Sequence, residues 1–200
     1  MSATRSTLPA PARLVQEVRK SKFVANAANV STSHGALAFI DAIADRSATH
    51  NCWAYRIGLD YRFNDDGEPG GTAGKPILQA IDGQGFDQVA VVVARWFGGI
   101  KLGSGGLIRA YGGCAAECLR SAAKRELIEM SSVEFALNFA AIPVLHSRLV
   151  EFAAEKLGET FSGDGVVLRL RLPSDRVDAL SVLLADLSRG RTYLRRLDSV

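Results

Sequence analysis

Glycines and cations gather in the segment RWFGGIKLGSGGLIRAYGG, residues 95–113, directly after the apolar run 89–94. The segment holds seven glycines, one lysine and two arginines. Glycine lets backbone N–H groups approach a ligand closely, and a helix that starts after such a loop adds partial positive charge at its N-terminus. The pattern therefore predicts a site for an anion such as phosphate. We expect this site to be formed by Lys75, Arg95, Lys101, Gly103, Ser104, Gly105, Gly106, Arg109 and Tyr111.

The glycine spacing differs from two known phosphate loops. Ser104 follows residues 99–103 where a Walker A loop requires Gly-Lys-Ser/Thr, and the pattern is not the GxGxxG of a dinucleotide site. Glycine-rich turns also allow close packing of backbone, so a purely structural role is the alternative interpretation.

Aromatic side chains accompany the cations. Trp96, Phe97 and Tyr111 lie in the glycine-rich segment, and Arg56 adds a further cation upstream. Proteins bind single-stranded nucleic acid by neutralising phosphates with cations and stacking bases on aromatic rings, so the combination indicates that class of ligand. On a strand, Arg95 and Phe97 would share one face and Trp96 the other, and we expect Trp96 to be buried.

A second unusual segment, NDDGEPGGTAGKPI at residues 64–77, joins three carboxylates to four glycines. Asp65, Asp66 and Glu68 could hold Mg²⁺ or divide the roles of acid and base. Asp-Gly and Pro-Gly are also common turn dipeptides, and we interpret the segment as a turn with a backbone role. Whether it contacts a metal stays open at this point.

The chain contains three cysteines, Cys52, Cys114 and Cys118. An odd number without a secretory signal argues against a disulfide framework. Cys114 and Cys118 would share a helical face, and His50 lies next but one to Cys52, so a zinc site is an alternative. Because these spacings match zinc motifs poorly, we expect reduced, metal-free thiols.

Composition and charge bound the class of protein. The chain has 200 residues, is 48% hydrophobic and carries a net charge of +3, less than the concentrated charge of a dedicated duplex-DNA binder. Its longest fully apolar run, residues 89–94, is far shorter than the roughly 20 residues that span a bilayer, so no membrane partner is expected. Residues 1–15 read as a flexible tail without a signal peptide, and the expected location is the cytoplasm.

Thirteen of the 19 glycines lie between Gly67 and Gly113, and ordinary patterning resumes after Met130. This change predicts two domains, residues 16–130 and 131–200. The first is expected to contain a helix over 35–45, a strand over 53–59, a central strand over 89–94 and a helix over 107–124. The second has strands over 135–139 and 166–172 and helices over 145–157 and 174–187, which we interpret as a βαββα plait with an optional short final strand. The predicted fold class is α+β.

Four blocks of the sequence carry a family resemblance: SKF (21–23), THNCWAYRIG (49–58), DDGEPGGTAGKPIL (65–78) and ARWFGGIKLGSGGLIRAYG (94–112). They resemble the signature blocks of the YigZ/IMPACT family. The resemblance implies an N-terminal domain like domain 2 of ribosomal protein S5 and a ferredoxin-like C-terminal domain, a tandem similar to the last two domains of translocating elongation factors. The motif residues that it implies at the functional surface are His50, Asn51, Asp66, Glu68, Thr72 and Phe97.

Taken with the cationic segment, the resemblance implies a non-enzymatic protein that binds nucleic acid or the ribosome and regulates translation or a stress response. The expected partner is RNA or the ribosome, with a protein partner in translation control as a further option, and no cofactor or metal is expected. Two alternatives stay open. One is a small-molecule phosphotransferase, because KLGSGGL is loosely similar to the loop of GHMP kinases, and the other is a pure protein-interaction module. The oligomeric state is not predicted.

Overall fold

The computed structural model describes residues 5–197, and the chain divides into two compact units, Met1–Leu127 and Ile128–Val200. Each unit combines helices with β-sheet, as the α+β prediction requires. The division lies close to the predicted boundary between residues 130 and 131. No helix among the described residues is both long enough and apolar enough to cross a membrane.

The N-terminal unit is built on a five-stranded antiparallel sheet whose strands lie in the order β2-β3-β6-β4-β5. The strands are β2 (Ala12–Val18), β3 (Ser21–Asn29), β6 (Val89–Trp96), β4 (His50–Ile57) and β5 (Asp60–Asn64). A separate pair, β1 (Ser6–Thr7) and β7 (Arg125–Glu126), joins the two ends of this unit.

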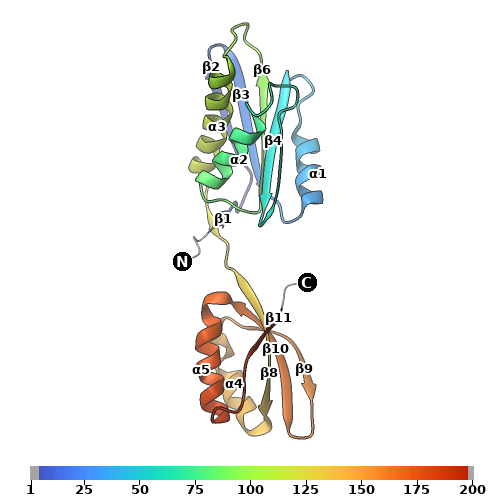
Figure 1. The fold of residues 1–200 in the computed structure, drawn as a ribbon, viewed down its shortest axis with the longest axis vertical. Helices are drawn as coiled ribbons and strands as arrows, with labels where there is room; N and C mark the ends of the chain where they lie inside the picture. Colours follow the sequence, from blue (N-terminus) through green and yellow to red (C-terminus); the bar gives the residue numbers. More distant parts are fainter. Residues whose placement is uncertain (1–4, 198–200) are drawn as a thin grey trace. The chain divides into compact units, whose positions relative to one another are not determined.

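Helices cover both faces of this sheet (Figure 1): α1 (Ser33–Ile43) on one face, and α2 (Gly74–Gly83) with α3 (Ser104–Ser121) on the other. Successive side chains of a strand point to opposite faces, so β6 supplies Val91 and Val93 to the core under α2 and α3, and Ala90 and Val92 to the core under α1. This double burial explains why the apolar run does not alternate, and the prediction of a central strand is confirmed.

The prediction that residues 1–15 form a flexible tail is wrong over most of that range. Residues 1–4 of that tail lie outside the described residues. Ser6 and Thr7 are paired in β1, Leu8 is 1% exposed, and β2, from Ala12 onward, forms the edge of the main sheet. Leu14 and Val18 pack against the core, and this burial outweighs the turn signal of Pro9 and Pro11.

The C-terminal unit is a βαββαβ arrangement whose antiparallel sheet has the order β11-β8-β10-β9. Its strands are β8 (Met130–Asn138), β9 (Glu155–Phe161), β10 (Gly165–Pro173) and β11 (Arg195–Leu197), and its helices are α4 (Ile142–Arg148) and α5 (Val177–Ser188). Three short 3₁₀ turns, η1 (Phe139–Ala141), η2 (Leu149–Phe152) and η3 (Ser174–Arg176), flank the helices. Both helices pack on one face of the sheet over a single core.

Two predicted elements end earlier than their apolar spacing indicated. The helix over 145–157 is broken at Ala153, whose φ is 49°, so Leu157 lies in β9 and is half exposed. The strand over 53–59 ends at Ile57, and Leu59 is 97% exposed in the β4–β5 turn. In both places a leucine matched the period by chance without having a core to pack against.

Candidate functional site

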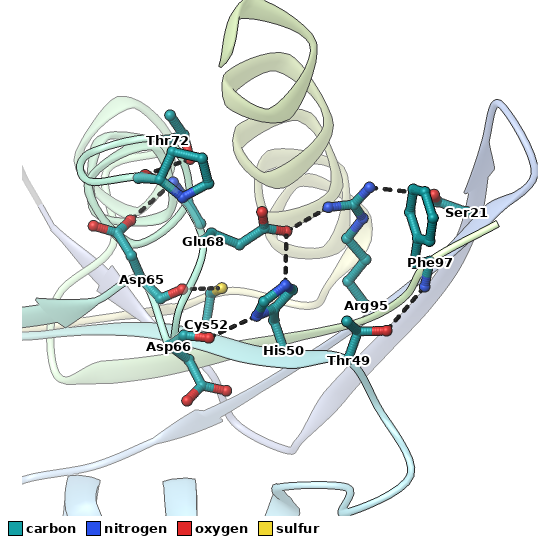
Figure 2. Close-up of polar contacts among 12 residues, drawn as sticks. Ser21, Thr49, His50, Cys52, Asp65, Asp66, Glu68, Thr72, Arg95 and Phe97 are labelled. Atoms are coloured by element: carbon teal, nitrogen blue, oxygen red, sulfur yellow. Dashed lines mark hydrogen bonds and ion pairs between the residues drawn. The ribbon is translucent and has the colours of Figure 1, made fainter. Parts of the chain in front are cut away.

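Several segments leave the N-terminal sheet at the same end. Lys22 pairs with Trp96 and His50 with Arg95, so β3 and β4 begin where β6 ends. Strand β5 runs toward the same end and stops at Asn64, opposite Trp53, and Asp66 then reaches His50. The two glycine-rich segments, residues 65–73 and 97–103, therefore both start here. Figure 2 shows the polar side chains between them.

A buried carboxylate is the centre of this cluster. Glu68 is 8% exposed, and its Oε1 accepts hydrogen bonds from Arg95 Nη1 at 2.6 Å and from the Tyr111 hydroxyl at 2.7 Å. His50 Nε2 lies 3.9 Å from the same oxygen (Figure 2). Glu68 thus links the 65–73 segment to β4, β6 and α3. Burial, together with the hydrogen bond to Glu68, raises the pKa of Tyr111 far above its ordinary value.

This network corrects two predicted ligand residues. Arg95 is 5% exposed and paired with Glu68, and Tyr111 is fully buried, so neither side chain is available to a phosphate or a base at the surface. The Arg95 guanidinium lies 5.6 Å from the ring centroids of both Phe23 and Phe97, and its Nε has no hydrogen-bond partner within the described part of the chain. Contacts with the two rings partly replace the missing partner.

A carboxylate of the acidic segment, that of Asp65, binds backbone N–H groups that follow it in the chain. Asp65 accepts hydrogen bonds from the N–H groups of Gly71 at 2.8 Å, Ala73 at 3.0 Å and Gly74 at 2.8 Å, which places a carboxylate at the start of α2. Partial burial by itself raises the pKa of Asp65, but these backbone donors outweigh it and hold the pKa below its ordinary value. Asp65 therefore acts as an internal anion for the loop.

The neighbouring motif residues attach the same loop to β4. Asp66 Oδ2 accepts from the Asn51 N–H at 2.5 Å, and His50 Nδ1 lies 2.7 Å from the Asp66 carbonyl oxygen. Because a carbonyl oxygen can only accept, this contact assigns a proton to Nδ1 and turns Nε2 toward Glu68. Thr72 donates to the Pro69 carbonyl at 2.6 Å. Among the described residues, no group of three or more His, Cys, Asp or Glu side chains is arranged to hold a metal.

All three thiols are buried. Burial raises the pKa of Cys52 and of Cys114 to about 12, and that of Cys118 to about 11. The Cys52 thiol donates to the Asp65 carbonyl at 3.0 Å. At neutral pH these groups are protonated, and a protonated, buried thiol is a poor nucleophile and a poor zinc ligand.

Other predicted residues do lie at the surface. Lys75, Lys101, Gly103, Ser104, Gly105 and Arg109 are exposed, Gly106 is half-buried, and Phe97 is 47% exposed. The α3 helix begins at Ser104, with Gly103 as its N-cap at a φ of 71° that favours glycine. No side chain in the described region caps this terminus, and its first turn contains no acidic residue. Arg109 Nη1 lies beside this turn, 3.7 Å from where a Cβ on Gly105 would stand.

Two further residues singled out in the sequence, Trp96 and Arg56, lie on the neighbouring strands β6 and β4. Trp96 is half-buried, its indole N–H donates to Ser47 Oγ at 3.1 Å, and the Lys22 ammonium lies 4.9 Å from its ring centroid. Arg56 lies in an ion pair with Asp82, in the half of β4 away from the cluster. Arg56 therefore does not belong with the exposed cations Lys75, Lys101 and Arg109.

The sequence reasoning missed Ser21 and Thr49. Ser21 Oγ accepts from the Gly98 N–H at 3.2 Å, and Thr49 Oγ1 accepts from the Phe97 N–H at 3.0 Å. These two hydroxyls hold the start of the 97–103 segment. Ser21 stands in the quoted SKF block and Thr49 in the quoted THNCWAYRIG block, and that was the available signal.

Comparisons with known proteins agree with this layout. The model of the Impact N-terminal domain matches residues 19–119, and that of a domain of unknown function, DUF1949, matches residues 135–191. An IMPACT family member of Thermus thermophilus is 44% identical over 88% of this chain and 98% of its own length. The IMPACT family member YigZ of Escherichia coli is 32% identical over 94% of this chain and 96% of its own length. A solved structure of a hypothetical protein, 30% identical, covers both chains completely with a TM-score of 0.71. This chain belongs to the YigZ/IMPACT family.

Proposed function

We propose that this protein is a non-enzymatic cytoplasmic regulator of translation or of a stress response that binds single-stranded RNA, free or within the ribosome, through its N-terminal unit. The observation that carries the proposal is the exposed start of α3, where uncapped backbone amides lie beside the guanidinium of Arg109 and the exposed Lys101 precedes them in the chain. Residues 95–113 contain no acidic side chain that could satisfy these amides. An anion from outside is their natural partner.

Exposed aromatic and cationic groups of the neighbouring segments fit a single strand better than an isolated phosphate. Phe97 offers a half-exposed ring for a base, and Lys75 at the first turn of α2 adds a further exposed cation. Stacking on one aromatic ring contributes about 1–3 kcal/mol per base, while the cations bind the phosphates. Catalysis has little support, because Glu68 is committed to Arg95 and Tyr111 and the thiols are protonated.

The fold assignments belong to the same proposal. The βαββαβ order and the sheet order β11-β8-β10-β9 support a ferredoxin-like C-terminal domain. We assign the N-terminal unit to the type of domain 2 of ribosomal protein S5 on the family resemblance. Such a tandem fits a protein that acts on the translation apparatus.

Titration of fluorescently labelled single-stranded RNA at several salt concentrations tests the binding. We expect Arg109→Ala and Lys101→Ala each to lower the slope of log affinity against log salt by about 0.7, the contribution of one phosphate contact to a single strand. Arg109→Lys should also bind more weakly, because lysine lacks the planar fork that binds two phosphate oxygens. Arg120→Ala, in the last turn of the same helix, is the matched control and should leave the slope unchanged.

The same titration separates the alternatives. Identical slopes for wild type, Arg109→Ala and Lys101→Ala would eliminate this anion site. Crosslinking and pull-down from lysate with and without RNase then distinguishes the partner classes. A protein partner that stays bound after RNase treatment and at high salt would favour the protein-interaction module instead.

A further inference from the structure

A strained turn lies next to the proposed RNA site. The hairpin between β2 and β3 has a two-residue loop, because Val18 pairs with Ser21. Its two residues, Arg19 and Lys20, have φ values of 47° and 65°. Asparagine followed by glycine fits such a loop with least strain, whereas long cationic side chains rarely occupy it. Two cations are thus held where the backbone conformation favours other residues.

This turn is in direct contact with the 97–103 segment. A Cβ on Gly98 would lie 2.0 Å from the Lys20 carbonyl oxygen, so only glycine permits the observed approach of the two backbones. The Gly98 N–H also donates to Ser21 Oγ, at 3.2 Å. The turn is therefore fixed against the loop that carries Phe97 and Lys101.

The charged side chains of the turn and of the glycine-rich segment itself are all cationic. Arg19 and Lys20 are exposed, and neither forms an ion pair with any residue in the 5–197 range. Residues 18–23 and 95–113 together contain no aspartate or glutamate. In the 97–103 segment that contacts the turn, Phe97 and Ile100 expose 47% and 40% of their surface. The pattern is apolar faces flanked by unneutralised cations, as in sites for single-stranded nucleic acid.

We propose that the β2–β3 turn forms a second contact with the backbone of the bound RNA. Arg19 and Lys20 bind phosphates of the same RNA strand whose neighbouring phosphate is held at the start of α3. This inference rests on the proposed function and extends its site to a turn that lies in another part of the sequence. Persistent strain at a fixed, exposed position is typical of functional residues. The ligand proposed for this turn is RNA. Binding of an acidic protein or of an anionic membrane in its place is an outcome that the test would reveal.

The double variant Arg19→Asn/Lys20→Gly separates charge from folding, because it installs the residues that the turn prefers. We expect its unfolding midpoint to equal or exceed that of the wild type, while the salt slope for labelled single-stranded RNA falls by about 1.4, two contacts of about 0.7 each. When salt is lowered from about 1 M to about 0.1 M, the affinity of this variant should therefore rise roughly 25-fold less than that of the wild type. A second variant, Arg19→Gln/Lys20→Gln, keeps longer side chains and should show the same loss.

Arg13→Gln/Arg120→Gln is the matched control. It also removes two positive charges, one at the start of β2 and one in the last turn of α3. The salt slope of this variant should stay at the wild-type value. A turn variant with the slope of this control would overturn the inference while leaving the proposed function intact. A wild type without salt-dependent RNA binding would overturn both. Turn-dependent binding to a polyglutamate peptide or to vesicles of anionic lipid, with no binding to RNA, would also reject both.

Discussion

The two glycine-rich segments of the N-terminal unit end in helices that begin in opposite ways. At the start of α2, three backbone N–H groups are bound by the carboxylate of Asp65, a residue of the same loop. At the start of α3, the first turn contains no acidic residue and no capping side chain in the described structure. Glycine content is similar, so the difference is whether the protein supplies its own anion. A terminus satisfied from within stabilises the fold, and a terminus left open can take a ligand.

Glu68→Gln should produce the largest effect, because it removes a buried carboxylate of residues 65–73 and leaves the buried Arg95 without a charged partner. We expect the free energy of unfolding to fall by about 3–5 kcal/mol, measured by urea denaturation. Breaking the exposed Arg120–Glu117 pair with Arg120→Gln is the control and should cost less than about 1 kcal/mol. Equal effects of the two substitutions would contradict the central role of Glu68.

Asp65→Ala should lower the free energy of unfolding by about 3 kcal/mol, because three N–H groups lose a charged acceptor. The effect should depend on pH. The pKa of Asp65 is lower in the folded chain than its ordinary value, so its contribution is complete above the unfolded pKa and disappears as pH falls through the folded one.

Comparison with the neutral variant Asp65→Asn isolates this dependence. The difference in unfolding free energy between wild type and Asp65→Asn should be constant near neutral pH and should shrink as the pH is lowered below about 4. A difference that stays the same down to strongly acidic pH would show that charge does not matter at this terminus.

Ser104→Asp tests the comparison at the start of α3, because it gives this helix an internal anion like that of α2. We expect a small gain in stability, about 0.5 kcal/mol, because an acidic residue in the first turn interacts favourably with the helix dipole. RNA affinity should fall in the same variant, because the new carboxylate repels phosphate. Ser104→Asn, neutral and of similar size, should retain most of the binding. Tighter RNA binding by Ser104→Asp would refute the idea that this terminus receives an anion.

Patterns within single elements predicted much of the fold. The unbroken apolar run of β6 indicated a strand buried on both faces, and the alternation over 166–172 indicated β10. The edge strand β2 was missed because its sequence, ARLVQEV, mixes apolar and polar residues without regular alternation. It is stabilised by pairing with β3, which composition does not reveal. The end of α4 was missed because Leu157 continued the apolar spacing beyond the last buried position.

The candidate site could be predicted only in part, for a related reason. Lys101 and Arg109 are exposed, as the predicted binding role requires, and that role stays a prediction. Arg95 and Tyr111 were assigned to the surface although both bind Glu68, which lies 27 and 43 positions away along the chain. Sequence spacing cannot reveal which cation a distant carboxylate will neutralise. Arg19 and Lys20 were overlooked because their turn meets the glycine segment only in three dimensions.

The pairing of β1 with β7 has a consequence for the order in which the N-terminal unit forms. Ser6 and Thr7 pair with Glu126 and Arg125, and Ser6 also exchanges backbone hydrogen bonds with Gly85 and Asp87. These contacts join the beginning of the unit to residues that are synthesised much later. During synthesis, the first strand must wait until residue 126 has left the ribosomal tunnel before its final partner exists. Completion of this unit is therefore a late event on the nascent chain, reached when the last strand closes against the first.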